Sequence, residues 1–583
     1  MSLVPFLAIS FGAAAAALIV RRYRRLSLAI GLLGLLAATI VALAIDPGDR
    51  LAVGPGRLEV TEFGRLFLVL GCSSGLVITI VGLATAWQRN LPSALLGGFG
   101  ALGLAMSIGD PIIALVAILA GALVGSLVTL TRPVTARNVQ VASREFRAIA
   151  VAGALALVGM AWIARPLGAL AEEPTVFGLA YLAVALAAAI RFGEIPFHRW
   201  AARLADSAPE VALPLLLAWA PAGFAVVALA WMDRSIAPLL LPLGVERSVV
   251  LAVGVMSIVL GAIAAWLQDD LEHVVGYSIV QDAGFVVLGL AVLDPAAWQP
   301  TRTWILVFVV VKTAFAAWAV AVRTRFGTRR IPELDGWARR SPALAVGLAL
   351  IVLATIGLPG LASWDVRARL VELSVTSEPI QLLVIVGGLA SLAYYGRIAV
   401  VGARSPSALV ALGPSERPHW PTPAETDAPV DPARPTERVA TTASAVATVA
   451  RFEARARVGW NANRAPIASA GVVILALTSL AVAGGGLGVA TAAAAPAPEP
   501  VAPTETFVPG QTEPPSPGPG ESGQPSTEPT SGPSVEPSAG PSQEPASGAP
   551  TTGPTPTVVP SSPTPSAGSS PPPGGTPTPA PTA

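Results

Sequence analysis

One side chain in this sequence stands out for the chemistry that it could do. Lys312 lies near the middle of the apolar run TWILVFVVVKTAFAAWAVAV, residues 303–322, and it is the only lysine among 37 basic residues. A lysine at the centre of a bilayer costs about 2.5–3.5 kcal/mol on insertion scales, so it indicates a functional site by default. Arginine stays charged in proteins, whereas a buried lysine can lose its proton. We therefore predict that Lys312 exchanges protons; the alternatives are chance or a lysine that snorkels to an interface.

A possible partner for this lysine is Asp282, which lies near the middle of the preceding apolar run, 273–293, in the segment YSIVQDAGF. The two residues lie at similar depths in consecutive runs. Because two isolated buried charges would each be costly, we predict that Asp282 and Lys312 approach within pairing distance. The alternative is that Asp282 is a polar residue satisfied by a neighbouring helix.

Four more ionisable residues are candidates for a proton path. Arg191 and Glu194 are three residues apart on one predicted helix face, where they could form a pair; Glu194 either supplies an acid for proton transfer or only neutralises Arg191. His198, just inside the membrane face, either feeds protons from the cytoplasm or caps a helix at the interface. Arg367 cannot cycle a proton, so it either holds a fixed charge or lies at the outer interface.

These residues require a frame of membrane-spanning helices. The chain has 583 residues, of which 53% are hydrophobic and 13% charged, unlike an ordinary soluble protein. Apolar runs of about 17–25 residues are long enough to cross a bilayer. We predict an all-α integral membrane protein with about 14 such helices, near 3–20, 27–45, 65–87, 92–108, 111–131, 146–164, 174–198, 209–232, 249–266, 273–293, 303–322, 342–363, 379–402 and 467–490.

The distribution of arginine predicts how these helices are oriented. With the N-terminus outside, the arginines gather in the loops that would face the cytoplasm, while the last outer segment, 491–583, has none. Cytoplasmic loops of membrane proteins carry such an excess. We therefore expect a multi-pass protein of a bacterial-type cytoplasmic membrane, with both termini extracytoplasmic and residues 403–466 inside.

Glycine and proline interrupt two of the predicted helices, at Gly193 and Pro196 in 174–198 and at Gly357, Pro359 and Gly360 in 342–363. Proline removes a backbone donor, and a helix broken inside a membrane survives only in protein or beside water. The breaks fall on the fourth helix of two units of five, which are predicted to be inverted repeats, 91–232 (the first half) and 249–402 (the second half). Three further helices precede this 91–402 core, in 1–90.

The remaining segments are predicted to lie outside the core. Residues 403–466 form a cytoplasmic linker whose second part is helix-prone, either along the membrane surface or as a solvated helix. A last transmembrane helix spans 467–490. Residues 491–583 are rich in Pro, Ser, Thr and Gly and cannot bury a core, so we expect a disordered extracytoplasmic tail.

Composition also limits the kinds of ligand. Cys72 is the only cysteine, and the three histidines are far apart in sequence, which excludes a cysteine-rich metal or iron–sulfur site. The net charge of +1 gives no indication of nucleic-acid binding. We expect no cofactor on this chain.

Four segments in one order resemble the antiporter-like membrane subunits of respiratory complex I (NADH:quinone oxidoreductase), Mrp-type Na⁺/H⁺ antiporters and membrane-bound hydrogenases. They are RFGEIPFHRWAARLADSAPEVALPLLLAWAPAGF, DDLEHVVGYSIVQDAGFVVLGL, VFVVVKTAFAAW, and PELDGWARRSP followed by ATIGLPG, and the resemblance covers about 90–400. The matching residues are Pro196, Phe197, His198, Trp200, Ala208, Pro209, Tyr277, Ser278, Gly284, Lys312, Leu334, Gly336, Pro342, Gly357 and Pro359.

The resemblance implies two inverted half-channels joined by a central polar axis, with Lys312 on the family's central lysine. The chain departs from the family at several positions. The family's glutamate in the fifth helix has no counterpart in PIIALVAILAGALVGSLVTL, and the lysine of its eighth helix falls near Ala220 or Pro221. Arg191 stands where the family has a lysine, and Arg367 where it has a lysine or glutamate.

The resemblance implies a proton-translocating membrane subunit of a complex I-like or hydrogenase assembly. Its partners would be the lipid bilayer, other membrane subunits and a transported ion, H⁺ or Na⁺, and any redox site would lie on another subunit. The lost glutamate and the arginines favour an alternative, a structural subunit that conducts no protons. A free-standing cation/proton antiporter is the third possibility.

Overall fold

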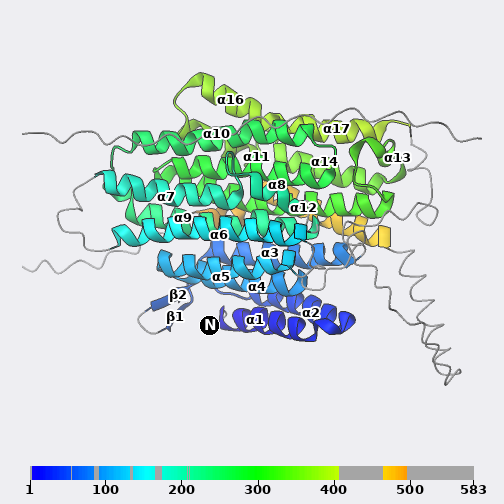
Figure 1. Cartoon of the computed structure of the whole chain (residues 1–583), viewed down its shortest axis with the longest axis horizontal. Coiled ribbons are helices and arrows are strands. Elements are labelled where there is room, and N and C mark those ends of the chain that lie inside the picture. The colour runs from blue at the N-terminus through cyan, green and yellow to red at the C-terminus, as the bar shows by residue number, and fades with distance from the viewer. Residues whose placement is uncertain are drawn as a thin grey trace, which may run out of the picture. The chain divides into compact units, whose positions relative to one another are not determined.

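The computed structural model describes residues 3–53, 56–83, 91–130, 136–164, 174–205, 208, 210–405 and 464–494. Within these ranges the chain is almost entirely α-helical, as predicted. Figure 1 shows the helices running side by side with roughly parallel axes, from α1 and α2 at one side of the stack to α16 at the other. The predicted linker helix, most of the predicted tail, and His419 lie outside the described residues.

Six α-helices and one short 3₁₀-helix lie in the described part of residues 3–163: three α-helices precede the first half, and the other three are the first three of that half. Their bounds are α1 (Leu3–Ile19), η1 (Val20–Arg22), α2 (Arg24–Leu43), α3 (Glu62–Leu83), α4 (Leu91–Ser107), α5 (Pro111–Leu130) and α6 (Ala136–Ile163). A hairpin that the sequence did not predict lies between α2 and α3. Its antiparallel strands, β1 (Arg50–Val53) and β2 (Gly56–Glu59), place Arg50 opposite Glu59, and the two side chains pair at 3.2 Å.

The rest of the core begins with the first broken helix. Its elements are α7 (Pro174–Phe192), α8 (Arg199–Ala205), η3 (Glu210–Ala212), the π-helix η4 (Leu215–Trp219), α9 (Ala220–Ser235), η5 (Ala237–Leu239), α10 (Gly244–Leu267), α11 (Leu271–Ala291), η6 (Pro295–Ala297), α12 (Trp298–Phe326), η7 (Ile331–Glu333), α13 (Trp337–Arg340), α14 (Pro342–Ile356), α15 (Ala362–Ser374), α16 (Glu378–Leu389) and α17 (Ser391–Ala403). A further helix, Arg464–Ala483, is followed by α21 (Val489–Ala493).

Length and composition identify the helices that can cross a membrane. In the described part of the chain, 11 helical stretches are long and apolar enough, and three apolar helices, 91–107, 111–126 and 342–356, are shorter. Every predicted apolar run overlaps one of these helices. The count of 14 spans and the inverted repeat stay predictions.

The core of the bundle is formed by α11 and α12. In an apolar 18-residue stretch of each helix, the share of buried residues is 100% for α12 and 94% for α11, but only 22% for the first helix of the chain. A helix that is hydrophobic all round belongs in the centre of a bundle. The only lysine of the chain therefore lies on the helix that is best shielded from lipid.

Both predicted helix breaks are present in the structure. The first separates α7 from α8, and the second separates α14 from α15. The last helical residue is followed in each case by a glycine with positive φ, Gly193 at +68° and Gly357 at +70°. A side chain rarely adopts this backbone conformation, so glycine is the residue that allows the chain to leave each helix here.

Candidate functional site

The centre of the candidate site is an ion pair between α11 and α12. Lys312 Nζ lies 2.6 Å from Asp282 Oδ2, and the two side chains are 0% and 2% exposed. The predicted contact between them is confirmed. Taking two charges out of water costs several kcal/mol for each ion, and their attraction compensates only when the geometry is good. Such a pair is kept for a reason other than stability alone.

Neighbouring side chains bind the backbone and hydroxyl groups around the pair but leave part of it unpaired. Trp304 Nε1 donates to the backbone carbonyl of Asp282 (2.9 Å), and Trp219 Nε1 donates to Thr313 Oγ1 (3.0 Å), next to Lys312. Asp282 Oδ1 has no hydrogen-bond partner among the described residues. A buried carboxylate oxygen without a partner is expensive, which makes this oxygen a place for water or a mobile proton.

Two tyrosines of α17 continue the polar region away from the ion pair. The rings of Tyr394 and Tyr395 lie 4.5 Å apart, and Tyr395 packs edge-on against Phe315 at 5.0 Å. Both tyrosines are buried, and neither hydroxyl has a hydrogen-bond partner in the described ranges. The charges of Lys312 and Asp282 act on Tyr395. The sequence prediction missed both; the visible signal was a pair of phenols inside an apolar run.

Arg367 is buried just after the second break rather than exposed at an interface. It is 7% exposed, and its guanidinium carbon lies 5.4 Å from the ring centre of Phe285 and 5.1 Å from that of Trp304. It donates to the backbone carbonyl of Ile356, the last residue of α14. Its charge also acts on Asp282. Of the two predicted alternatives, the position fits the fixed charge.

The first break separates two residues whose spacing allowed them to pair. Arg191 is 2% exposed and Glu194 is 0% exposed, but no ion pair within 4 Å joins them in the described part of the chain, and neither oxygen of Glu194 has a hydrogen-bond partner there. The pair that their spacing allowed is therefore not formed. Its i, i+3 geometry needs a continuous helix, whereas the chain leaves α7 at Gly193 and turns Glu194 toward Ser257 of α10.

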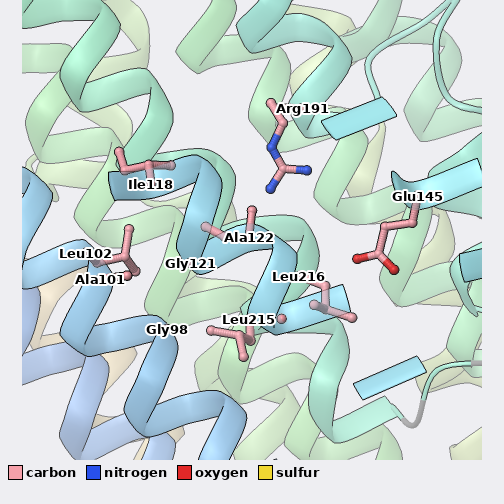
Figure 2. Close-up of a pocket in the computed structure, with 12 residues that line it drawn as sticks. Gly98, Ala101, Leu102, Ile118, Gly121, Ala122, Glu145, Arg191, Leu215 and Leu216 are labelled. Atoms are coloured by element: carbon pink, nitrogen blue, oxygen red, sulfur yellow. The ribbon is translucent and has the colours of Figure 1, made fainter. Parts of the chain in front are cut away.

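Arg191 instead points into a small cavity between α5, α6 and α7 (Figure 2). Glu145 of α6 points into the same cavity from the other side, and it is 2% exposed. The wall formed by α5 is made of small residues, among them Gly121 and Gly125. The cavity volume is about 20 Å³, which is enough for one water molecule. We refer to this space as the α5–α7 cavity.

Glu145 was missed because the sequence prediction placed it in a loop. The apolar run was taken to begin at residue 146, after the charged segment ARNVQVASREFR, whereas α6 begins at Ala136. The polar residues therefore form the first turns of the helix, and one of their acids is carried into the protein. A signal was available, because Glu145 is followed at i+3 and i+4 by the apolar positions Ala148 and Ile149.

Comparison with known proteins finds one matching family model and several relatives. The family model described as "NADH:quinone oxidoreductase/Mrp antiporter, TM" matches residues 149–392. NADH-quinone oxidoreductase subunit N of Salinispora tropica is 29% identical over 419 residues, covering 64% of this chain and 79% of that protein. The subunit N of Sphingopyxis alaskensis is 24% identical over 373 residues, covering 60% and 76%. Over this central part, the chain is similar to the antiporter-like membrane subunits.

Solved structures place the fold in the same group. A chain of respiratory complex I from Thermus thermophilus matches with a TM-score of 0.59 and 20% identity, covering 83% of this chain and 98% of that one. A chain of the Mrp complex from Dietzia sp. matches with a TM-score of 0.61 and 18% identity, covering 84% and 96%. At these identities the likeness shows the fold alone.

The chain carries a second charged cluster that sequence reasoning missed. Arg323, at the end of α12, bonds to Glu210 of η3 and to Glu272 of α11, the latter at 3.1 Å. Arg329 bonds to the other oxygen of Glu272 at 2.6 Å. Glu210 belongs to the first half and the other three residues to the second. This salt-bridge cluster joins the two halves at the ends of their helices.

His198 lies apart from this cluster, in the turn between α7 and α8. Its ring centre is 6.3 Å from that of Tyr277, and its Nδ1 has no hydrogen-bond partner in the described ranges. Burial, and then the charge of Arg199, lower the pKa of His198 below its ordinary value of 6.5. The residue is thus neutral near pH 7 at the edge of the antiporter-like core.

Metal binding has no evident site in the described part of this antiporter-like chain, where no group of three or more His, Cys, Asp or Glu side chains is arranged to hold an ion.

Proposed function

We propose that this chain is a proton-translocating membrane subunit of a complex I-like NADH:quinone oxidoreductase, and that Lys312 and Asp282 form its central proton-exchanging pair. The observation that carries the proposal is the fully buried contact of 2.6 Å between the only lysine of the chain and an acid of the preceding helix. The relatives named as subunit N support the choice of assembly. Redox cofactors would lie on other subunits, and both termini would be extracytoplasmic.

The charges around the pair favour exchange over a permanent salt bridge. Asp282 is attracted by two cations, Lys312 at 2.6 Å and the more distant Arg367. Arg367 cannot release its proton, so it stabilises the carboxylate whether or not Lys312 is charged. When Lys312 releases a proton, Asp282 is still near a positive charge. The cost of leaving a buried acid alone is thereby reduced.

Polar groups extend from the pair in two directions. On one side, Tyr395 and Tyr394 continue toward the break between α14 and α15, where Thr355 lies. On the other side, Thr313 accepts a hydrogen bond from Trp219 of the π-helix η4, and residues of η4 line the α5–α7 cavity. π-helical turns occur frequently at functional sites. We propose that water completes this route between the two halves.

The experiment compares two variants of Lys312 with the unaltered chain in the assembled complex, in closed membrane vesicles. Lys312→Ala removes the amine, and Lys312→Arg is the matched control that keeps a positive charge but cannot release a proton. Proton uptake is measured for each NADH oxidised. The proposal expects the complexes that assemble with either variant to lose proton transport. Normal proton transport in Lys312→Arg would show that no proton passes through this residue.

The alternative of a non-conducting structural subunit rests on Arg191 and Arg367, two buried cations that cannot cycle protons. Under that alternative, Lys312→Ala reduces assembly, and the complexes that do assemble pump at the normal ratio. A free-standing antiporter would instead purify without quinone-reducing subunits. Purification of the chain from its own membrane under mild detergent distinguishes that third case.

A further inference from the structure

The α5–α7 cavity holds two buried charges of opposite sign that the central pair does not include. Arg191 of α7 and Glu145 of α6 are each 2% exposed and face the same space. No ion pair within 4 Å joins Arg191 to any described residue, and its Nε has no hydrogen-bond partner there. The charge of Glu145 nevertheless acts on the Arg191 guanidinium. A buried guanidinium nitrogen without a partner, facing a cavity of this size, is a place where a water molecule can bind.

The lining of the cavity leaves one residue able to carry a proton. The wall contributed by α5 has no ionisable side chain between Pro111 and Ser126. The π-helix contributes Leu215 and Leu216. Arg191 stays protonated, so among the lining residues only Glu145 can take up and release a proton. The other charged side chains on elements packed against α6 are Arg199 and Arg203 of α8.

We propose that Glu145 is a proton-carrying acid of the first half, that Arg191 is its fixed counter-charge, and that a water molecule in the α5–α7 cavity connects them. This inference rests on the proposed function and adds a second proton site to it. The carboxylate would accept H⁺ from the cavity water and return it to a water on the other side. The charge of the Glu145 side chain would change from −1 to zero and back, while that of Arg191 would stay constant.

The position of the cavity gives this charge change a way to reach the central pair. Leu215 and Leu216 belong to η4, which ends at Trp219, and Trp219 donates to Thr313 next to Lys312. The same short segment therefore borders the cavity at one end and the lysine helix at the other. When a proton binds to Glu145, the local charge on the cavity side of that segment becomes more positive by one.

The test compares Glu145→Gln and Glu145→Asp in the assembled complex. Glu145→Gln keeps the shape but cannot carry a proton, and we expect it to lower proton uptake per NADH by at least about tenfold. Glu145→Asp keeps the acid, and we expect it to restore a large part of the activity. Glu62→Gln is the control, because Glu62 is a partly exposed acid of α3 that pairs with Arg65.

A second measurement addresses protonation directly and is independent of electron transfer. The infrared spectrum of the purified complex should contain a protonated-carboxyl carbonyl band that shifts in D₂O and moves in Glu145→Asp. If Glu145→Gln does not assemble, this band in the Asp variant decides the matter. An unchanged band, or normal pumping by Glu145→Gln while Lys312→Arg is inactive, overturns the inference and leaves the proposed function standing. Normal pumping by both Glu145→Gln and Lys312→Arg overturns the inference and the proposed function together.

Discussion

The two halves of the core place opposite charges at different separations. In the second half, Lys312 and Asp282 are in contact at 2.6 Å, and the most apolar stretches of the two helices that carry them are 94–100% buried. In the first half, Arg191 and Glu145 line one cavity with room for a water molecule, and no ion pair within 4 Å joins Arg191 to a described residue. Contact suits a lysine that, as we propose, itself exchanges a proton. Separation suits a permanent cation if, as we propose, a water molecule in the cavity moves the proton.

The difference also concerns the helix that supplies the buried carboxylate of each half. The second half keeps a lysine where the resemblance places one. The first half has arginine at the corresponding helix and no acid on α5, and the structure places an acid of α6 beside it. A change of helix for one carboxylate keeps opposite charges facing one space. The arrangement of charges in the interior, rather than their position in the sequence, is what the two halves share.

The largest effect is expected from removing one partner of the contacting pair. Lys312→Met leaves Asp282 buried without its cation, which should destabilise the protein by about 3–5 kcal/mol. Lys312→Met combined with Asp282→Leu removes both charges and should recover most of that loss, but not proton transport. Thermal unfolding of the purified complex measures the stability. A double variant no more stable than the single one would contradict a direct pair.

The next effect compares the two helix breaks. Gly193→Ala and Gly357→Ala each place a side chain at positive φ, which costs about 1–3 kcal/mol. The added carbon at Gly357 would lie 2.8 Å from the backbone nitrogen of Trp364, whereas at Gly193 the first obstacle is the Ala201 side chain at 2.5 Å. At Gly357 a second atom, Ser363 Oγ, also lies within 2.6 Å of the added carbon, whereas at Gly193 the next atom is 3.7 Å away. We expect Gly357→Ala to lower the unfolding temperature more, and the reverse order would show that the first break is the stiffer one.

A smaller effect is expected at the link between the halves. Trp219→Phe keeps the ring that packs against Phe67 and Phe99 but removes the N–H that donates to Thr313. The loss should be about 1 kcal/mol of stability. If this link carries the coupling between the cavity and Lys312, proton uptake per NADH should fall further than stability alone explains. Unchanged pumping in a stable Trp219→Phe complex would locate the connection elsewhere.

The smallest effect concerns His198, outside both charge pairs. Its folded-state pKa is lowered, so the protein is at full stability above the ordinary pKa of 6.5, where the side chain is neutral in both states. As the pH falls below 6.5, the unfolded chain binds a proton more readily and stability decreases. His198→Gln should flatten this part of the stability–pH profile while leaving stability at pH 7.5 unchanged. The profile is measured by thermal unfolding between pH 5 and 8.

Sequence reasoning succeeded where a single residue type carried the information. One lysine in an apolar run and one aspartate at similar depth were enough to predict the contact between Lys312 and Asp282. Apolar length located the helices, and Gly–Pro clusters located both breaks. The helices and their breaks are local features of the sequence. The depth of a residue in the membrane follows from its position within an apolar run.

Sequence reasoning failed where a helix began or ended earlier than its apolar run. A polar first turn hid Glu145 in an assumed loop, and a helix assumed to continue past Phe192 produced a pair between Arg191 and Glu194 that the structure does not form. Neither the π-helix η4 nor the approach of Tyr395 to Lys312 has a pattern in the sequence, because both depend on how distant helices pack.

The placement of Asp282 and Lys312 on consecutive helices has a consequence for biosynthesis. The ribosome completes α11 and then α12 within a few dozen residues, so a hairpin of the two can leave the translocation channel as one unit with its charges already neutralised. The ammonium group then never meets lipid by itself. If the acid belonged to a helix made much later, the nascent lysine segment would have to wait in the membrane for its counter-ion.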